Sequence, residues 1–352
     1  GQVSEGFDVV DGDKDPKAKA NPDDPTRLER HGTQLAGLLV GSEGPAKING
    51  VARGATLLPI RVAGWQREAA GSWAVYGRTD QLVAGLERAV DPNADGVVLD
   101  AARVALVGVA EPFAAFEDSP SARAVAGALR LDTLVVAPAG NDGQAGPGYG
   151  SISGPGGSRA ALTVGAADLR DSSATVHLVL RTGLGVFFDR QVPLAGAVAP
   201  KESLSLRVGA PPLSQGALEQ GVTPKLGEFF DENGYSFVAG KAALVPAGAD
   251  PGYAASQAAK AGARAVVLFG DTLPAAGIGL DETVTVPVLS IPEENGRRLL
   301  DELESGRQVV ASLSTATAEQ QDDEGRVAPF SSRGLAFDGF VKPDLVAPGV
   351  GL

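Results

Sequence analysis

The feature that most constrains the fold is an alternation of short apolar runs with amphipathic helical stretches between residues 50 and 170. The runs read ATLLPIRV at 55–62, RVALVGV at 103–109, TLVVAPAG at 133–140 and AALTVGA at 160–166. Short, continuously apolar runs are typical of strands that are buried on both faces of a sheet. Strands that alternate with helices predict a parallel α/β sheet, whose ligand sites lie beyond the carboxyl ends of the strands.

Two stretches between these runs carry helix signals. Residues 79–90, TDQLVAGLERAV, begin at Thr79, which we predict to be the N-cap. Their apolar side chains share one helical face and are Leu82, Val83, Leu86 and Val90. Residues 119–131, SPSARAVAGALRL, begin with Ser-Pro, a preferred N-cap followed by proline at the first helical position.

Composition excludes several classes of protein. The 352 residues carry a net charge of −13, which disfavours nucleic acid and anionic membrane surfaces as partners. The chain has no cysteine, so disulfides and thiolate metal sites are excluded. Its apolar runs are all too short to span a bilayer. The chain begins GQVSEGFDVV without a methionine or a signal peptide, and we expect it to be cut from a longer protein.

The pattern of apolar and polar residues changes near residue 171. TVHLVLRTG and ESLSLRVGAPPL alternate with a period near two and predict antiparallel strands. A second α/β-like unit follows. The stretch KAALVPAG (241–248) leads to YAASQAAKAGARAVVLFG (253–270), which is predicted to be a helix and then a strand. VTVPVLSIPEENGRRLLDELESG (284–306) repeats the order of strand and then helix. In these we expect a helix that ends at Gly262 and another with Leu299, Leu300 and Leu303 on its buried side. An acidic, Gln-rich linker is predicted at 317–326. We therefore predict an inserted domain over 171–318 within a first domain formed by 1–170 and 319–352.

Four stretches together could carry chemistry. HGTQLAG (31–37) places His31 at the start of a helix whose Leu35, Leu38 and Leu39 we expect to face inward. VVAPAGNDG (135–143) is a buried strand that ends in a turn exposing Asn141. The other two stretches are GVARGATLLPIRV (50–62) and the Ser-, Gly- and Pro-rich PFSSRG…KPDLVAPG (329–349).

This set resembles the subtilisin-like serine proteases, the subtilases. HGTQLAG keeps five of the seven residues of that family's His-Gly-Thr-His-Val-Ala-Gly motif, and AGNDG (139–143) matches its Ala-Gly-Asn-x-Gly oxyanion motif. Phe-Ser-Ser-Arg-Gly at 330–334 and Lys-Pro-Asp-x-x-Ala-Pro-Gly at 342–349 stand in the family's order. Any one motif is weak evidence, but four motifs in one order are specific. The resemblance covers 1–170 and 326–352, and it implies a parallel-sheet, three-layer α/β fold.

The resemblance also implies roles for particular residues. His31 corresponds to the general base that takes the proton of a serine nucleophile and returns it to the leaving amine. Asn141 corresponds to the donor whose side-chain amide stabilises the oxyanion of the tetrahedral intermediate. Considered alone, His31 could be a structural histidine whose hydrogen bonds are satisfied at the start of a helix. Asn141 could likewise be part of an Asn-Asp-Gly turn. His177, within TVHLVL, has no motif around it and is predicted to be a strand residue.

Two members of the family's triad have no counterpart in these 352 residues. We find no Asp-Ser/Thr-Gly strand before His31, and the Asp-rich segment GFDVVDGDKDP (6–16) resembles the family's segment just after that strand. No Gly-Thr-Ser motif comes after the Ala-Pro-Gly element, and Ser331 and Ser332 belong to a different element. A serine needs an oriented base to attack at neutral pH. The 352 residues alone are therefore expected not to hydrolyse peptides.

The chain departs from the family in two further places. Gln34 replaces the second histidine of the histidine motif, which lies outside the triad. Gly108, Val109 and Ala110 stand where the family has Ser-Leu-Gly on the edge that binds substrate. Backbone hydrogen bonding to an extended peptide does not need those side chains. The resemblance implies that the substrate also contacts Ala139 and Gly140.

An acidic loop at 91–100, DPNADGVVLD, raises the possibility of a structural calcium ion. Its candidate ligands are Asp91, Asn93, Asp95 and Asp100 around Gly96. This spacing resembles the first half of an EF-hand loop but lacks the glutamate at position twelve, and a plain Asx turn explains it equally well. DGDKDP at 11–16 is predicted to be a solvated turn. The chemistry itself needs no cofactor.

The insert, above all residues 241–312, resembles the noncatalytic protease-associated domain of large subtilases, which is credited with substrate or partner contacts. The alternative is that the insert is a spacer.

The leading hypothesis is a secreted subtilase endopeptidase that binds a peptide or protein substrate as an extended strand. The alternative is a noncatalytic subtilase-like module that binds peptides or partners. Gly108-Val109-Ala110 favours the second hypothesis, whereas His31 and Asn141 favour the first.

Overall fold

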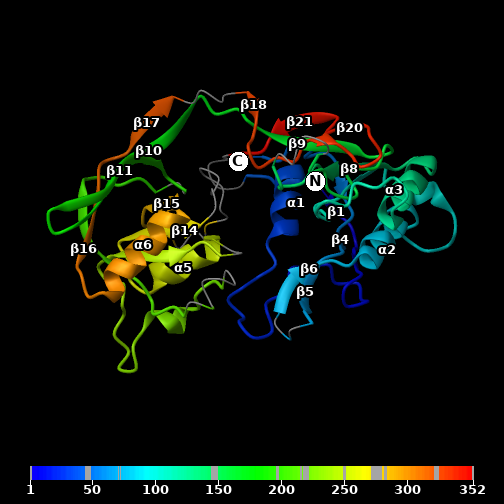
Figure 1. The fold of residues 1–352 in the computed structure, drawn as a ribbon. Coiled ribbons are helices and arrows are strands. Elements are labelled where there is room, and N and C mark those ends of the chain that lie inside the picture. The colour runs from blue at the N-terminus through cyan, green and yellow to red at the C-terminus, as the bar shows by residue number, and fades with distance from the viewer. Residues whose placement is uncertain are drawn as a thin grey trace. The chain divides into compact units, whose positions relative to one another are not determined.

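The computed structural model divides the chain into two compact units, which are described separately (Figure 1). Unit 1 comprises Gly1–Ala166 and Val327–Ala347, and unit 2 comprises Ala167–Arg326 and Pro348–Leu352. The structure describes residues 2–43, 49–69, 71, 73–143, 150–195, 198–214, 216, 222–248, 251–270, 280, 284–320 and 325–350. Within these residues, no helix combines the length and the apolar character needed to cross a membrane.

The central sheet of unit 1 is built from the predicted apolar runs. Its strands stand in the order β18-β9-β8-β7, with β21 also paired to β9. Their bounds are β7 Val104–Leu106, β8 Leu134–Pro138, β9 Leu162–Asp168, β18 Arg326–Val327 and β21 Leu345–Pro348. The pairs β7–β8 and β8–β9 are parallel, as the alternation of strands and helices predicts.

Two helices of unit 1, α2 and α3, lie together in Figure 1 and pack on the sheet core. α2 spans Thr79–Val90, the predicted stretch, but Arg78 is its N-cap and Thr79 its first helical residue. The prediction of Thr79 as N-cap is therefore wrong, because the Gln81 side chain accepts the Arg78 N–H and closes the turn one residue earlier. α3 spans Pro120–Arg130, and the Ser119 hydroxyl caps it by accepting the Ala122 N–H at 3.1 Å.

The N-terminal part of unit 1 corrects one strand prediction. Residues 55–62 form two short strands, β3 (Thr56–Leu57) and β4 (Ile60–Arg61), because Pro59 has no N–H to donate to a ladder. They pair in parallel with β1 (Gln2–Val3) and β2 (Phe7–Asp8). Two antiparallel pairs and a 3₁₀ turn also belong to the unit: β5 (Gly64–Arg67) with β6 (Trp73–Tyr76), β19 (Gly334–Leu335) with β20 (Val341–Lys342), and Val98–Asp100.

Helix α1, His31–Val40, begins at the predicted histidine but is not buried as predicted. None of its residues is buried, and the Leu38 side chain is 45% exposed. Leu35 and Leu39 are only partly covered. The inward-facing expectation is therefore wrong for Leu38, because among the described residues α1 packs mainly against β3.

Unit 2 is organised around one mixed sheet with the strand order β11-β10-β16-β12-β13-β14-β15, and β17 also pairs with β10. The strands are β10 Ser172–Thr182, β11 Gly185–Pro193, β12 Leu204–Gly209, β13 Ala242–Pro246, β14 Ala265–Gly270, β15 Val288–Pro292, β16 Val309–Leu313 and β17 Thr317–Gln320. The β10–β11, β10–β16 and β12–β16 pairs are antiparallel, whereas β12–β13, β13–β14 and β14–β15 are parallel. The parallel strands are buried on both faces, since helices cover them.

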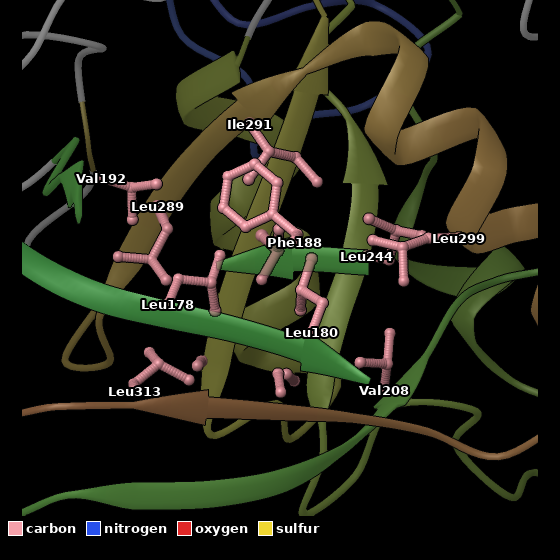
Figure 2. Close-up of a cluster of buried hydrophobic side chains, with 14 of the residues drawn as sticks. Leu178, Leu180, Phe188, Val192, Val208, Leu244, Leu289, Ile291, Leu299 and Leu313 are labelled. Carbon is pink, nitrogen blue, oxygen red and sulfur yellow. The ribbon is translucent and has the colours of Figure 1, made fainter. Parts of the chain in front are cut away.

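The core of unit 2 gathers side chains from sheet and helix. Figure 2 shows Leu178 and Leu180 of β10, Leu289 and Ile291 of β15 and Leu299 of α6 converging on one apolar cluster. α6 spans Glu293–Glu304, and α5, Pro251–Lys260, packs against a second cluster with the 3₁₀ turn Leu226–Phe229. Leu299 and Leu300 are buried as predicted, and Leu303 is partly buried against the same core.

The C-terminal border of unit 2 corrects the predicted linker. Thr317–Gln320 is strand β17, which pairs with β10 in the register Ser172↔Gln320 to Thr175↔Thr317. The strand forms by pairing with β10, although all four of its residues are exposed. The remainder of that linker prediction, 321–324, lies outside the described residues. The compact units change over at 166/167, 326/327 and 347/348.

Candidate active site

The His31 ring lies against the end of a central strand. Its Nε2 is 2.8 Å from the carbonyl oxygen of Gly108, the second residue after β7. A carbonyl oxygen only accepts hydrogen bonds, so Nε2 is the donor in this contact. Gly108 suits this contact because a Cβ there would lie 2.4 Å from the Leu35 side chain. The contact joins the start of α1 to the carboxyl end of β7.

The segment that enters α1 is held by a salt bridge rather than by a helix cap. Arg30, the N-cap, makes no side-chain cap hydrogen bond. Instead the Glu29 carboxylate accepts two bonds from the Arg61 guanidinium, at 2.8 and 2.7 Å, and one from the Trp65 N–H at 2.7 Å. The Arg61 and Glu29 side chains are only 6% and 10% exposed. A bidentate, buried pair of this kind fixes the backbone two residues before His31.

Arg61 also joins this salt bridge to a cluster of acidic residues near the N-terminus. Its Nη1 is 2.8 Å from the Asp8 carboxylate, whose side chain is fully buried, and Lys19 Nζ is also 2.8 Å from Asp8. Burial would raise the pKa of Asp8, but hydrogen bonds from Lys19, the backbone and Arg61 outweigh it and lower that pKa. Asp11 and Asp13 are exposed as expected of a solvated turn, yet both pair with Lys19.

Asn141 follows the strand next to β7. β7 and β8 are parallel neighbours, and the Val107 N–H continues their ladder to the Val136 carbonyl at 2.9 Å. Gly108 follows β7, whereas Gly140 and Asn141 follow β8. The carboxyl ends of adjacent parallel strands meet at the same edge of a sheet. The His31 contact and the exposed Asn141 therefore lie at one edge of one sheet.

The turn at Asn141 needs glycine before it. Gly140 has φ +113°, and a Cβ there would lie 2.1 Å from the Ser153 hydroxyl oxygen and 2.7 Å from that of Ser332. The turn is held by Ser332: its N–H donates to the Gly140 carbonyl at 2.9 Å, and the Asp142 N–H donates to its hydroxyl at 3.0 Å. Ser332 is thus part of the site's scaffold.

The predicted substrate edge is partly open. Val109 is partly buried and Ala110 is exposed. Next to them Glu111 and Gly154 exchange two backbone hydrogen bonds, at 2.7 and 2.9 Å. Ala139 is buried in the small cluster with Ile152, and its N–H is bonded to the Val164 carbonyl at 2.9 Å. Its side chain is therefore part of this small core.

The acidic loop at 91–100 forms Asx turns in the structure. The Asp91 carboxylate accepts the N–H groups of Asp95 and Gly96, and the Asn93 side-chain oxygen accepts the Asp95 N–H. Asp100 lies apart in the 3₁₀ turn Val98–Asp100. The described residues hold no group of three or more histidine, aspartate or glutamate side chains arranged for a metal ion. Calcium at this loop stays a prediction.

Two further predictions concern residues outside the proposed chemistry. His177 is an exposed residue of β10, and its Nε2 lies 2.5 Å from the Asp189 carboxylate. Ser331 and Ser332 are buried, and the Ser331 hydroxyl accepts the Ala166 N–H at 3.0 Å. Neither serine is exposed to a substrate. Sequence reasoning missed the Glu29–Arg61–Asp8 cluster, whose only signal is an arginine within an otherwise apolar strand.

Comparison with known proteins places the chain in a family. The subtilase family model, peptidase S8, matches residues 3–351. The chain belongs to the subtilase family. It is 30% identical over 352 residues to the "Minor extracellular protease Vpr" of Bacillus subtilis (strain 168), covering 99% of this chain. The subtilase chain spans 38% of the length of that relative.

Solved structures similar to this subtilase chain are more distant. A psychrophilic subtilisin-like protease, Apa1, from the Antarctic psychrotroph Pseudoalteromonas sp. AS-11 is 17% identical with a TM-score of 0.32, covering 92% of this chain and 79% of that one. An aminopeptidase from Aneurinibacillus sp. strain AM-1 is 18% identical with a TM-score of 0.30, covering 43% of this chain and 36% of that one.

Proposed function

We propose that this subtilase chain contributes the general base and the oxyanion donor of a serine endopeptidase, with a peptide or protein as substrate. The proposal rests on the observation that the histidine motif and the Asn141 motif both lie at one edge of one sheet. His31 contacts the segment after β7, and Asn141 follows the parallel neighbour β8. This edge is where α/β sheets bind ligands.

In this proposal His31 takes the proton of the nucleophilic serine and returns it to the leaving amine. The proton is received at Nε2 in this chemistry, so the His31–Gly108 hydrogen bond has to open and the ring proton has to move from Nε2 to Nδ1 first. The Asn141 amide then donates to the oxyanion of the tetrahedral intermediate. Loss of one such donor lowers turnover about 10²–10³-fold, a magnitude taken from subtilisin itself.

The substrate is proposed to lie as an extended strand along Gly108–Ala110, with the Ala139–Gly140 segment near the scissile bond. Support comes from the position of both segments, which directly follow β7 and β8. Main-chain hydrogen bonds supply affinity in this mode, so the departure from Ser-Leu-Gly leaves it intact.

The 352 residues contain neither an Asp-Ser/Thr-Gly strand before His31 nor a Gly-Thr-Ser motif after the Ala-Pro-Gly element. We therefore propose that they do not hydrolyse peptides alone, and that the aspartate and the serine belong to the full-length protein. A base and an oxyanion donor without a nucleophile cannot form an acyl-enzyme.

The test uses a fluorophosphonate probe, which labels only an activated serine. The full-length protein should be labelled at a serine outside residues 1–352, and His31→Ala should abolish labelling because triad members act as a unit. The isogenic control His177→Ala removes the other histidine, which lies in unit 2, and should leave labelling unchanged. Labelling of Ser331 or Ser332, or equal labelling of the His31 variant, would contradict the assignment.

A noncatalytic peptide-binding module is the second candidate. The Gly108 carbonyl occupies Nε2 of His31, and Gly-Val-Ala replaces the family's Ser-Leu-Gly at the same place. A full-length protein that is not labelled but still binds an unfolded polypeptide would favour this candidate over the protease.

Three further proposals concern the whole protein. We propose that it is secreted, which the extracellular relative supports. Unit 2 is proposed to be a protease-associated domain that contacts substrate or a partner, on the resemblance of its 241–312 segment.

Calcium binding at Asp91–Asp100 would raise the melting temperature by mass action. An unchanged transition after chelation would exclude the calcium site.

A further inference from the structure

Ser331 and Ser332 are adjacent, buried and without a part in the chemistry proposed above. They are 1% and 0% exposed. Each hydroxyl accepts one backbone N–H at 3.0 Å, and the two bonds reach different places: Ser331 receives the Ala166 N–H of β9, and Ser332 receives the Asp142 N–H. Of the two, only Ser332 contacts the residue that directly follows Asn141.

The Ser332 backbone contacts the other side of the same residue. Its N–H donates to the Gly140 carbonyl at 2.9 Å, so Ser332 bonds both to the residue before Asn141 and to the residue after it. A third bond, from the Gly143 N–H to the Phe330 carbonyl at 2.9 Å, extends this attachment. The backbone of Asn141 is therefore fixed at both ends by a segment some 190 residues later in the chain.

The space beside Gly140 is taken up by two serine side chains. At Gly140, a Cβ would lie 2.7 Å from the Ser332 oxygen and 2.1 Å from the Ser153 oxygen. Gly140 itself holds φ +113°, a conformation that its neighbours must maintain. Without the Ser332 hydroxyl, the Asp142 N–H would lose its acceptor. The space left by the hydroxyl would lie beside Gly140, whose backbone has the widest range of conformations in the turn.

We propose that Ser332 is a positioning residue for the oxyanion donor, a role that rests on the proposed function of Asn141. Its hydroxyl sets the Gly140–Asp142 backbone and so aims the Asn141 amide at the point where negative charge develops. Catalytic donors need placement to a fraction of an ångström, and a misplacement of about 1 Å can cost about 10²-fold in rate. Ser332 itself does not touch the reacting atoms.

The test compares Ser332→Ala with Ser331→Ala in the full-length protein. The two variants remove the same atom from adjacent, equally buried sites and should lower the melting temperature similarly. Turnover is measured per fluorophosphonate-titrated site, so that unfolded molecules are not counted. Ser332→Ala should lower kcat about 10–100-fold with KM unchanged, because oxyanion contacts act only in the transition state. Ser331→Ala should keep kcat within about twofold.

Each other outcome overturns the proposal. Equal kcat for the two variants, or a raised KM with unchanged kcat in Ser332→Ala, would show a structural or substrate-binding role and leave the protease assignment intact. A wild-type protein without hydrolysis or labelling would overturn both. If Ser332→Ala does not fold, Ser332→Cys, which retains a weaker acceptor, replaces it, with an intermediate loss of kcat expected.

Discussion

At the residue scale, unit 1 depends on one guanidinium. Arg61 lies on a short strand and bonds to Asp8 on the neighbouring strand and to Glu29 next to α1. Asp8 and Arg61 are direct partners in the β2–β4 register. Removing one member of such a buried pair leaves an uncompensated charge, which typically costs about 3–5 kcal/mol. Asp8 is therefore the residue where charge and stability are most closely linked.

We predict that Asp8→Asn reduces the acid sensitivity of unit 1. The pKa of folded Asp8 is lowered below its unfolded value of about 3.9, so its stabilisation is present above about pH 4 and is lost as pH falls through the folded pKa. Urea unfolding at pH 7 and pH 3 should show a less stable variant at pH 7 and a smaller loss on acidification than in wild type.

The control is Asp80→Asn, whose carboxylate pairs with Arg78 but is 69% exposed. Exposed pairs contribute little, so this variant should behave as wild type at both values of pH. Parallel pH dependence in wild type and Asp8→Asn would contradict the prediction. The sequence alone could not reveal the pair, because its partners are 53 positions apart and follow no period. His31 and Asn141 were recognisable only because local motifs surround them.

At the element scale, α2 packs so closely that one of its positions requires glycine. A Cβ on Gly85 would lie 2.3 Å from Val62 Cγ1, a short branched side chain that cannot turn away. Gly127, inside α3, has nothing within 4 Å of the same position. Alanine in place of glycine gains about 1 kcal/mol of helix propensity, whereas overpacking costs about 1–3 kcal/mol.

We therefore predict opposite effects for the same substitution. Gly85→Ala should lower the free energy of unfolding by about 1 kcal/mol, because the clash exceeds the gain in propensity. Gly127→Ala should raise it by up to about 1 kcal/mol. Urea denaturation of the two variants beside wild type measures both, and stabilisation by Gly85→Ala would show that Val62 gives way.

The elements that the sequence predicted well are those with strong local signals. α2 and α3 follow from apolar spacing and from Ser119-Pro120, and β7, β8 and β9 follow from apolar runs. The break between β3 and β4 comes from Pro59, within a run that is mostly apolar. The exposure of Leu38 in α1 depends on what packs beside the helix, which periodicity does not specify.

At the scale of the whole molecule, the two units have separate cores. The unit 2 clusters draw only on residues 176–316, and the unit 1 clusters draw on residues 82–161 and Ala336 with Phe340. The sequence predicts borders of the inserted domain near 171 and 318, and the compact units of the structure change over at 166/167, 326/327 and 347/348. Part of β17 lies between 318 and 326, and its polar composition is typical of a linker, whereas its strand forms by pairing with β10.

Separate cores predict that the two units unfold in separate transitions, which a matched pair of isoleucines can test. Ile152 in unit 1 and Ile291 in unit 2 are 1% and 2% exposed. Substitution of either by alanine should cost its own unit about 2–5 kcal/mol through lost burial and the cavity left behind. In calorimetry of the 352-residue chain, each variant should lower one transition by several degrees and leave the other in place. The transition that Ile152→Ala lowers should also be the acid-sensitive one, because Asp8 belongs to unit 1. A single transition that both variants lower equally would show that the chain folds as one cooperative unit, since destabilising either core would then unfold both.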